Sequence, residues 1–175
     1  MIEPCDVPPG TLLQKYRVDG TFADCYTTTL HGQISLARFV GAFYTTPLFK
    51  LERFVLRVAG RASTDDDARQ LAEGARDAFS AWTVEARAKD ELLLCDVLGR
   101  TRSWLMVAPV PGADAVTRLY FGSAVVPKHD PQTGKRRLGT GFRALLGFHK
   151  LYSVALLRAA RRALELQNRH ERIGA

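Results

Sequence analysis

His149 stands in the middle of the apolar side of an amphipathic segment, Phe142 to Glu165, and Tyr152 lies one turn further on. An inward imidazole must satisfy two ring nitrogens, and leaving one buried and unpaired costs about 1–3 kcal/mol. Two interpretations follow. His149 is either a core histidine, bonded to a backbone carbonyl or to a residue such as Ser123, or a polar group that orients a ligand or acts as a general acid/base. The Tyr152 hydroxyl allows the same two interpretations.

Arg102 and Trp104 share one face of a predicted strand, Arg102 to Pro109. A buried guanidinium needs an anionic or strongly polar partner. Asp24 or Asp96 could supply it in a structural ion pair, and so could the carboxylate of a bound small molecule. A shift of the strand register by one residue would instead expose Arg102.

Asp24 and Tyr26 lie on the same face of a predicted first strand, where the acid could pair with Arg102 or orient His149. The candidates for catalysis are therefore His149 and Asp24. The candidates for ligand binding are His149, Tyr152, Arg102, Trp104, Asp24 and Tyr26.

The remaining chemistry-bearing residues point to no cofactor and no metal. No pair of His, Cys or carboxylate residues has the spacing of metal ligands, and no cofactor fingerprint is present. Cys5, Cys25 and Cys95 are odd in number and widely spaced, which indicates reduced thiols in a cytoplasmic protein. The N-terminus lacks the features of a signal peptide, and no apolar run reaches the length of about 20 residues that spans a bilayer.

The 175 residues fit one domain, and 46% apolar with 25% charged residues is an ordinary globular composition. The net charge of +7 is uneven: the part from Lys128 onward holds 11 Lys and Arg against three acidic residues. This basic end leaves an anionic membrane surface open as a partner. Nucleic acid is not expected, because no aromatic residues interleave with the charges.

The elements that must position these residues follow from periodicity and turn signals. Residues 1–20 are expected to form an irregular arm, since Pro4, Pro8, Pro9 and Gly10 interrupt its first half. A strand is predicted over Phe22 to Leu30, and a helix around Ile34 to Phe43. A second helix should begin at Pro47 after a Thr46 cap, and a third after Ser63 or Thr64, fading near Gly74.

The middle of the chain is predicted to be an antiparallel meander. Trp82 to Ala88 and Glu91 to Val97 should form a hairpin around Lys89-Asp90, followed by strands over Arg102 to Pro109 and Thr117 to Pro127. The face with Trp82, Val84, Ala86, Leu93, Cys95 and Val97 is the better core face. The opposite face carries Leu92, Leu94, Leu105 and Val107, and should be covered by the helices of residues 34–73 or by a second copy of the chain.

A polar loop, Lys128 to Gly139, leads to a long helix from about Thr140 to Arg169. The predicted fold class is α+β: a curved antiparallel sheet of about five or more strands, packed on a long C-terminal helix, with short helices between the first and second strands. Residues 21–170 form this single domain.

The order of elements over residues 20–170 resembles the helix-grip fold of the START and Bet v 1-like (SRPBCC) superfamily. The stretches GRTRSWLMV (Gly99 to Val107), LYFGSAVV (Leu119 to Val126) and FRALLGFHKLYS (Phe142 to Ser153) resemble those of bacterial proteins of unknown function. The resemblance implies a cavity between the sheet and the last helix. It also implies the superfamily's range of functions: lipid and hormone carriers, polyketide cyclases and dehydratases, and oxygenase domains.

The sequence is compatible with three alternative functions. The first is a soluble protein that binds an apolar small molecule between the sheet and the C-terminal helix, oriented by His149, Tyr152 and Arg102. The second is a cyclase, dehydratase or hydrolase on the same scaffold, with His149 as acid/base and Arg102 stabilising negative charge. The third is binding of an anionic surface through the basic C-terminal part. A homodimer is left open for each.

Overall fold

The structure of the protein, a computed structural model, describes residues 1–18, 21–58, 60–129, 136–137 and 140–173; of 128–129, 136–137 and 140–148 it describes the backbone alone. Its main feature is one open antiparallel sheet of seven strands. Their order across the sheet is β1 (Glu3–Pro4), β2 (Phe22–His31), β7 (Val116–Val125), β6 (Thr101–Pro109), β5 (Glu91–Asp96), β4 (Trp82–Arg87) and β3 (Ala78–Phe79).

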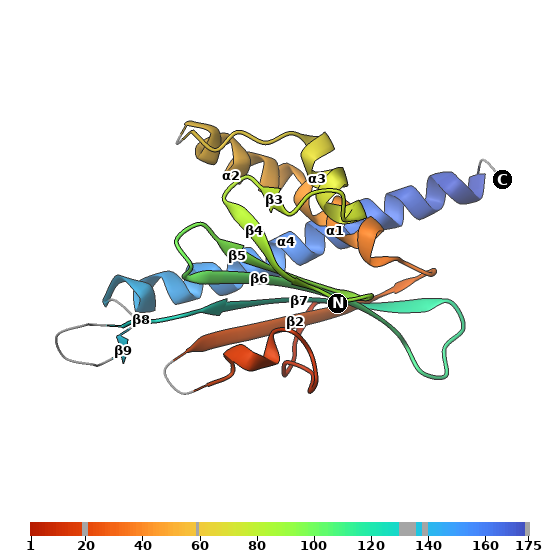
Figure 1. Cartoon of the computed structure of the whole chain (residues 1–175). Helices are drawn as coiled ribbons and strands as arrows, with labels where there is room; N and C mark the ends of the chain where they lie inside the picture. The colour runs from red at the N-terminus through yellow and green to blue at the C-terminus, as the bar shows by residue number, and fades with distance from the viewer. Residues whose placement is uncertain (19–20, 59, 130–135, 138–139, 174–175) are drawn as a thin grey trace.

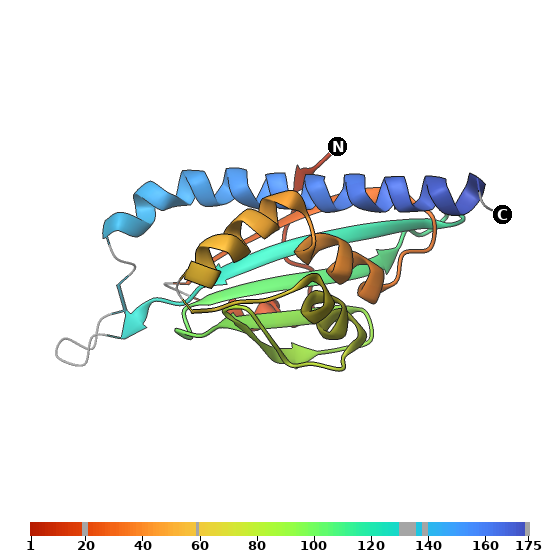
Figure 2. The same ribbon diagram turned by 90° about the horizontal axis from the view of Figure 1, so that it is seen from above.

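One face of this sheet, here the inner face, is covered by helices. These are α1 (Leu36–Tyr44), α2 (Pro47–Val58), α3 (Asp65–Glu73) and α4 (Thr140–Ile173). Seen from above, α4 runs along the length of the sheet, and α1 and α2 lie beside it (Figure 2). The N-terminal arm lies against the other, outer face (Figure 1). The predicted α+β class, with its helix-grip-like layout, is confirmed.

The helices between β2 and β3 begin where the sequence places caps. The Thr46 hydroxyl accepts a hydrogen bond from the N–H of Phe49 at 3.2 Å. Helix α2 starts at Pro47, a position where the N–H that proline lacks would have no partner within the helix. Thr64 and Asp67 form a reciprocal capping box at the start of α3, and Gly74 ends that helix with a φ of 80°. Local signals therefore explain where these helices begin and end.

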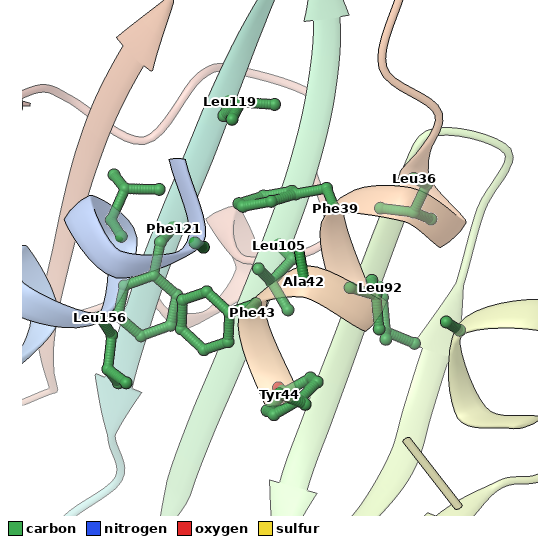
Figure 3. Close-up of a cluster of buried hydrophobic side chains, with 14 of the residues drawn as sticks. Leu36, Phe39, Ala42, Phe43, Tyr44, Leu92, Leu105, Leu119, Phe121 and Leu156 are labelled. Atoms are coloured by element: carbon green, nitrogen blue, oxygen red, sulfur yellow. The ribbon is translucent and has the colours of Figure 1, made fainter. Parts of the chain in front are cut away.

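The main core lies between the inner face and the helices. Phe43 of α1 is its centre, with its ring centroid 4.7 Å from that of Phe121 (Figure 3). Leu92, Leu105 and Leu119 project from three neighbouring strands towards it and are fully buried. Ring pairs at such separations add to the hydrophobic gain of burial.

The predicted core face of the hairpin is wrong in part, because β4 carries a bulge between Val84 and Ala86. A regular two-residue turn would place Val84 opposite Cys95 and Ala86 opposite Leu93; Ala86 does pair with Leu93, but Val84 pairs with Leu94. Trp82 and Val84 consequently join the inner face, together with Leu92 and Leu94, and α1 to α3 cover it. The alternative in which helices cover the Leu92 face is the one observed. Leu93 instead faces the arm.

The outer face is covered by the N-terminal arm, which is more ordered than predicted. It contains β1, paired with β2, and a 3-10 helix, η1 (Gln14–Tyr16). Leu13 is fully buried in a second, smaller core with Trp104 and Leu93. The backbone N–H of Leu12 donates to the Glu91 carboxylate at 2.8 Å. The arm thus gives the sheet a second buried face.

Two of the seven strands, β1 and β3, are not among those predicted, and each is two residues long. They form the two edges of the sheet. The predicted polar loop contains a small ribbon of β8 (Lys128–His129) and β9 (Arg136–Arg137), and its residues 130–135 and 138–139 lie outside the described part. No described helix combines the length and the apolar character that crossing a membrane requires.

Candidate functional site

A pocket of about 740 Å³ lies between the inner face of the sheet, α2 and α4. Its walls are mostly apolar, with Phe121 from the sheet, Leu56 from α2 and Leu156 from α4. Two hydrogen-bonded groups of polar side chains lie at its walls. One is centred on His149 and the other on Glu52.

His149 takes part in a chain of hydrogen bonds with two residues of the sheet. Asp24 and Ser123 pair directly across β2 and β7. The Ser123 hydroxyl donates to Asp24 Oδ1 at 2.5 Å and lies 2.6 Å from His149 Nε2. Because the hydroxyl has one proton, His149 must carry its proton on Nε2 and donate to Ser123. In the neutral imidazole, this tautomer leaves Nδ1 of His149 as a hydrogen-bond acceptor.

The surroundings of this chain hold it in place. The Phe22 ring meets the imidazole edge to face, with centroids 6.2 Å apart. Oδ2 of Asp24 is buried, has no hydrogen-bond partner among the described residues, and lies 3.9 Å from His149 Nε2. Burial, and then the nearby charge of Asp24, raise the pKa of Tyr26 to about 12. Asp24 and Tyr26 share one face of β2, as predicted, and Phe22 lies on that face too.

The second polar group joins the two helices of the pocket. The Tyr152 hydroxyl of α4 donates to the Glu52 carboxylate of α2. Burial raises the pKa of Glu52 even though the bond from Tyr152 acts in the opposite direction. The pKa of Tyr152 is also raised, by burial and by the charge of Glu52. Both residues line the pocket, so a polar pair faces an apolar space.

Trp82 and Ser153, which also line the pocket, each carry a buried polar atom without a hydrogen-bond partner among the described residues. These atoms are Nε1 of Trp82 and Oγ of Ser153. Buried polar groups are usually satisfied, so these two atoms are candidates for contact with a bound ligand or water.

Arg102 borders the pocket, but its guanidinium points to the outer face. Its Nε donates to Glu85 at 2.8 Å and to the Tyr16 hydroxyl at 3.0 Å, and its Nη1 donates to the carbonyl of Gly99 at 2.6 Å. Its partner is thus Glu85, and not Asp24 or Asp96. Glu85 is not predictable as this partner from the sequence, because the bulge that turns it outward leaves no trace in the periodicity.

Trp104 is placed with Arg102 on the outer face, as their spacing predicts, and so it does not line the pocket. It is fully buried under the arm, and its Nε1 donates to Glu91 at 2.8 Å. Tyr26 is buried in the main core and is also absent from the pocket walls. The structure therefore brings together His149, Asp24 and Tyr152 of the predicted residues, and separates Trp104 and the Arg102 guanidinium from them.

Two features of the pocket were not predicted from the sequence: the presence of Glu52, and the wall that α2 forms. A signal for Glu52 exists: it lies four residues from both Leu48 and Leu56, on the same side of the helix. An acid in the middle of an apolar row is an anomaly of the same kind as His149 in α4. A search for single polar residues on the apolar side of each predicted helix identifies both Glu52 and His149.

No family model matches this chain, and no curated protein is similar to it at a significant level. Within the described residues, no cluster of three or more His, Cys, Asp or Glu side chains could hold a metal ion.

Proposed function

We propose that the protein binds an apolar small molecule in the pocket between the sheet and the C-terminal helix. The observation that carries the proposal is the pocket itself, whose volume of about 740 Å³ falls in the range of small-molecule sites. Walls that are mostly apolar, with a few convergent polar groups, are typical of such sites. The resemblance to the START and Bet v 1-like superfamily agrees with this proposal.

The polar groups favour a ligand that donates hydrogen bonds. His149 offers Nδ1 as an acceptor, and Glu52 offers carboxylate oxygens. Among the described wall residues Arg102 is the one permanent cation, and Glu85 already neutralises it. A ligand carboxylate would therefore have no counter-charge in the pocket. We propose an apolar molecule with a hydroxyl or amino group.

The pocket can be tested by filling it. Ala155 of α4 lines the pocket, and Ala159, one turn further on, does not. We expect Ala155→Trp to weaken binding of the uncharged fluorophore N-phenyl-1-naphthylamine by about tenfold or more, because the indole takes the space of the ligand. Ala159→Trp is the matched control and should bind like the unsubstituted protein. Fluorescence titration measures both.

Leu56→Trp repeats the test from the opposite wall, in case Ala155→Trp impairs folding as measured by thermal unfolding. Equal fluorophore affinity for the unsubstituted protein and for a folded pocket-filling variant would contradict the proposal. Mass spectrometry of an organic extract of the purified protein should then identify a natural ligand bound in the unsubstituted protein and lost in the variant.

The Asp24–Ser123–His149 chain favours one alternative, an acid/base enzyme of cyclase, dehydratase or hydrolase type on the same scaffold. Asp24 orients Ser123, Ser123 orients the imidazole, and Nδ1 of His149 is left to accept a proton from a substrate. A Ser123 nucleophile is not favoured, because Ser123 lies within a strand and is 2% exposed.

Incubation of the extracted ligand with the unsubstituted protein and with His149→Gln separates the two functions. A ligand recovered unchanged from both supports binding alone. Conversion by the unsubstituted protein that His149→Gln abolishes, with fluorophore affinity retained, would replace the binding proposal by the enzymatic one.

A further inference from the structure

The outward side of α2 carries an apolar patch, formed with one residue of α4. Its members are Leu51, Phe54, Val55 and Val58 of α2 and Leu151 of α4. Each is between 60% and 79% exposed. Their spacing on α2 is that of a helix side, so the sequence pattern alone would put them in the core. A contiguous exposed patch of large apolar side chains marks a surface that meets a partner or a membrane.

The opposite side of α2 is anchored, so the patch does not result from loose packing. Arg53 is 9% exposed, donates to Asp65 at 2.6 Å and to the carbonyl of Ser63 at 2.7 Å, and lies over the Phe79 ring. Phe49, on the same side, is buried in the main core. Turning the patch inward would break these contacts. The structure therefore holds the apolar side outward.

The exposed charges around the patch are positive. Arg57 lies between Val55 and Val58 on α2, Arg61 follows α2, and Lys150 precedes Leu151 on α4. None of these three has a carboxylate within ion-pair distance among the described residues. The one acid within α2, Glu52, is turned away from this surface and bonded to Tyr152. An apolar strip beside unpaired cations is complementary to a bilayer that carries anionic lipids.

A second copy of the chain fits this surface less well. A twofold contact brings the same patch of both copies together, so the three cations of one copy would face those of the other. Such a contact would be repulsive without added acids.

We propose that the α2 patch docks on an anionic membrane surface, with Phe54 and Val58 inserted among the headgroups and Arg57 and Lys150 in contact with lipid phosphates. Leu51, Val55 and Leu151 belong both to the patch and to the rim of the pocket. Docking would therefore close the pocket mouth against the bilayer, and an apolar ligand could pass between them without crossing water. Passage of a ligand between the pocket and the bilayer rests on the proposed function, whereas docking on the membrane does not.

Co-sedimentation with vesicles tests the docking. The protein should bind vesicles of phosphatidylcholine mixed with phosphatidylserine, and added salt should weaken the binding. The double variant Phe54→Ser with Val58→Ser should lose about tenfold or more of the affinity, because two apolar side chains no longer enter the bilayer. The double variant Arg57→Glu with Lys150→Glu should lose binding to these vesicles as well.

The matched control is Leu166→Ser with Ile173→Ser, which replaces two exposed apolar residues of α4 outside the patch. It should bind vesicles like the unsubstituted protein. Vesicle binding that is absent, or equal in the Phe54/Val58 variant and in the control, would overturn the proposal. A dimer in sedimentation equilibrium that the Phe54/Val58 variant converts to a monomer would overturn it too, in favour of a second copy as occupant.

Failure of docking and failure of the pocket function give different results. Phe54 and Val58 do not line the pocket, so their variant should retain fluorophore binding in the absence of vesicles. Ala155→Trp should lose fluorophore binding and retain vesicle binding. A protein that binds vesicles but no fluorophore keeps the docking surface and loses the proposed function.

Discussion

Gly122 of β7 lies on the outer face of the sheet, where the arm leaves no room for a larger side chain. A Cβ atom there would lie 2.6 Å from Leu13 Cδ2, 2.9 Å from the carbonyl oxygen of Asp24 and 3.0 Å from Trp104 Cε3. The Leu13 methyl could move, but the Asp24 carbonyl belongs to the paired backbone of β2. Only glycine fits between the arm and the sheet at this point.

Gly122→Ala should therefore lower the free energy of unfolding by about 1–3 kcal/mol, the usual cost of overpacking. Gly41→Ala, within α1, is the matched control, because no atom lies within 4 Å of its added Cβ. That control should be neutral or stabilising by about 0.5–1 kcal/mol, since alanine favours a helix. Urea unfolding measures both, and equal stability of the two variants would show that the arm does not pack on Gly122.

Cys5 and Cys25 form a thiol pair that their separation in the sequence conceals. Their sulfur atoms are 2.9 Å apart, across the β1–β2 pairing. The hydrogen bond between them lowers the pKa of Cys5 and raises that of Cys25. Cys5 is also the more exposed of the two, so it is the thiol that an oxidant meets first.

Oxidised glutathione is expected to convert this pair into a disulfide. The Cys5 thiolate attacks glutathione disulfide and releases one glutathione; Cys25 then attacks the Cys5 sulfur and releases the second. The product, lighter by two hydrogens, should be more stable by about 3 kcal/mol, as expected for a closed loop of this size. Intact mass and thermal unfolding measure this, with Cys95→Ser as the unaffected control. Glutathione that remains attached to Cys5 would contradict the prediction.

At the scale of elements, the arm is held by a cluster of charges on the outer face. Lys15 contacts Glu85 at 2.6 Å, and Arg102 lies over the Tyr16 ring while it pairs with Glu85. Burial acts to raise the pKa of Glu85, but Lys15, Tyr16 and Arg102 outweigh it and hold that pKa below its usual range. A depressed pKa stabilises the folded state above the unfolded pKa, and this stabilisation is lost as the pH falls through the folded pKa.

The arm should consequently loosen in acid, below about pH 4, the region of a free Glu side chain. Glu85→Gln should release it already at neutral pH, with a loss of about 1–3 kcal/mol in unfolding free energy, because Arg102 then keeps a partly buried charge without its anion. Hydrogen exchange of residues 12–17 reports the release. Glu73→Gln, an exposed acid of α3, is the control and should leave exchange in the arm unchanged.

The types and order of the long elements could be predicted from the sequence, because their signals are local. Thr46-Pro47 and Thr64 with Asp67 determine where two helices begin, and strict alternation on β2 places Asp24 inward. The two-residue strands β1 and β3 could not be predicted, since they exist only through pairing with a longer neighbour. The bulge in β4 leaves no mark in the alternation of residues, and for that reason the predicted core face of the hairpin is wrong in part.

For the whole molecule, the prediction that α4 covers the sheet depended on length and amphipathicity, which the sequence displays directly. The candidate site was predictable only in so far as it lies on α4 and β2, where periodicity fixes direction. The environment of Arg102 and Trp104 could not be predicted, because it depends on the segment that covers the outer face. That cover is the arm, and its Pro-rich sequence has no periodicity from which packing could be inferred.

The two edges of the sheet are two-residue strands, and one of them contains Pro4, which has no N–H to offer. Long bare edges recruit strands from other chains, and short or proline-containing edges prevent this. Proteolytic loss of residues 1–5 would remove the strand that pairs with Tyr26 and Thr27, and β2 would itself become the edge of the sheet. A nicked protein should then offer the longer edge of β2 for pairing with strands of other chains, which ties resistance to aggregation to the first few residues of the arm.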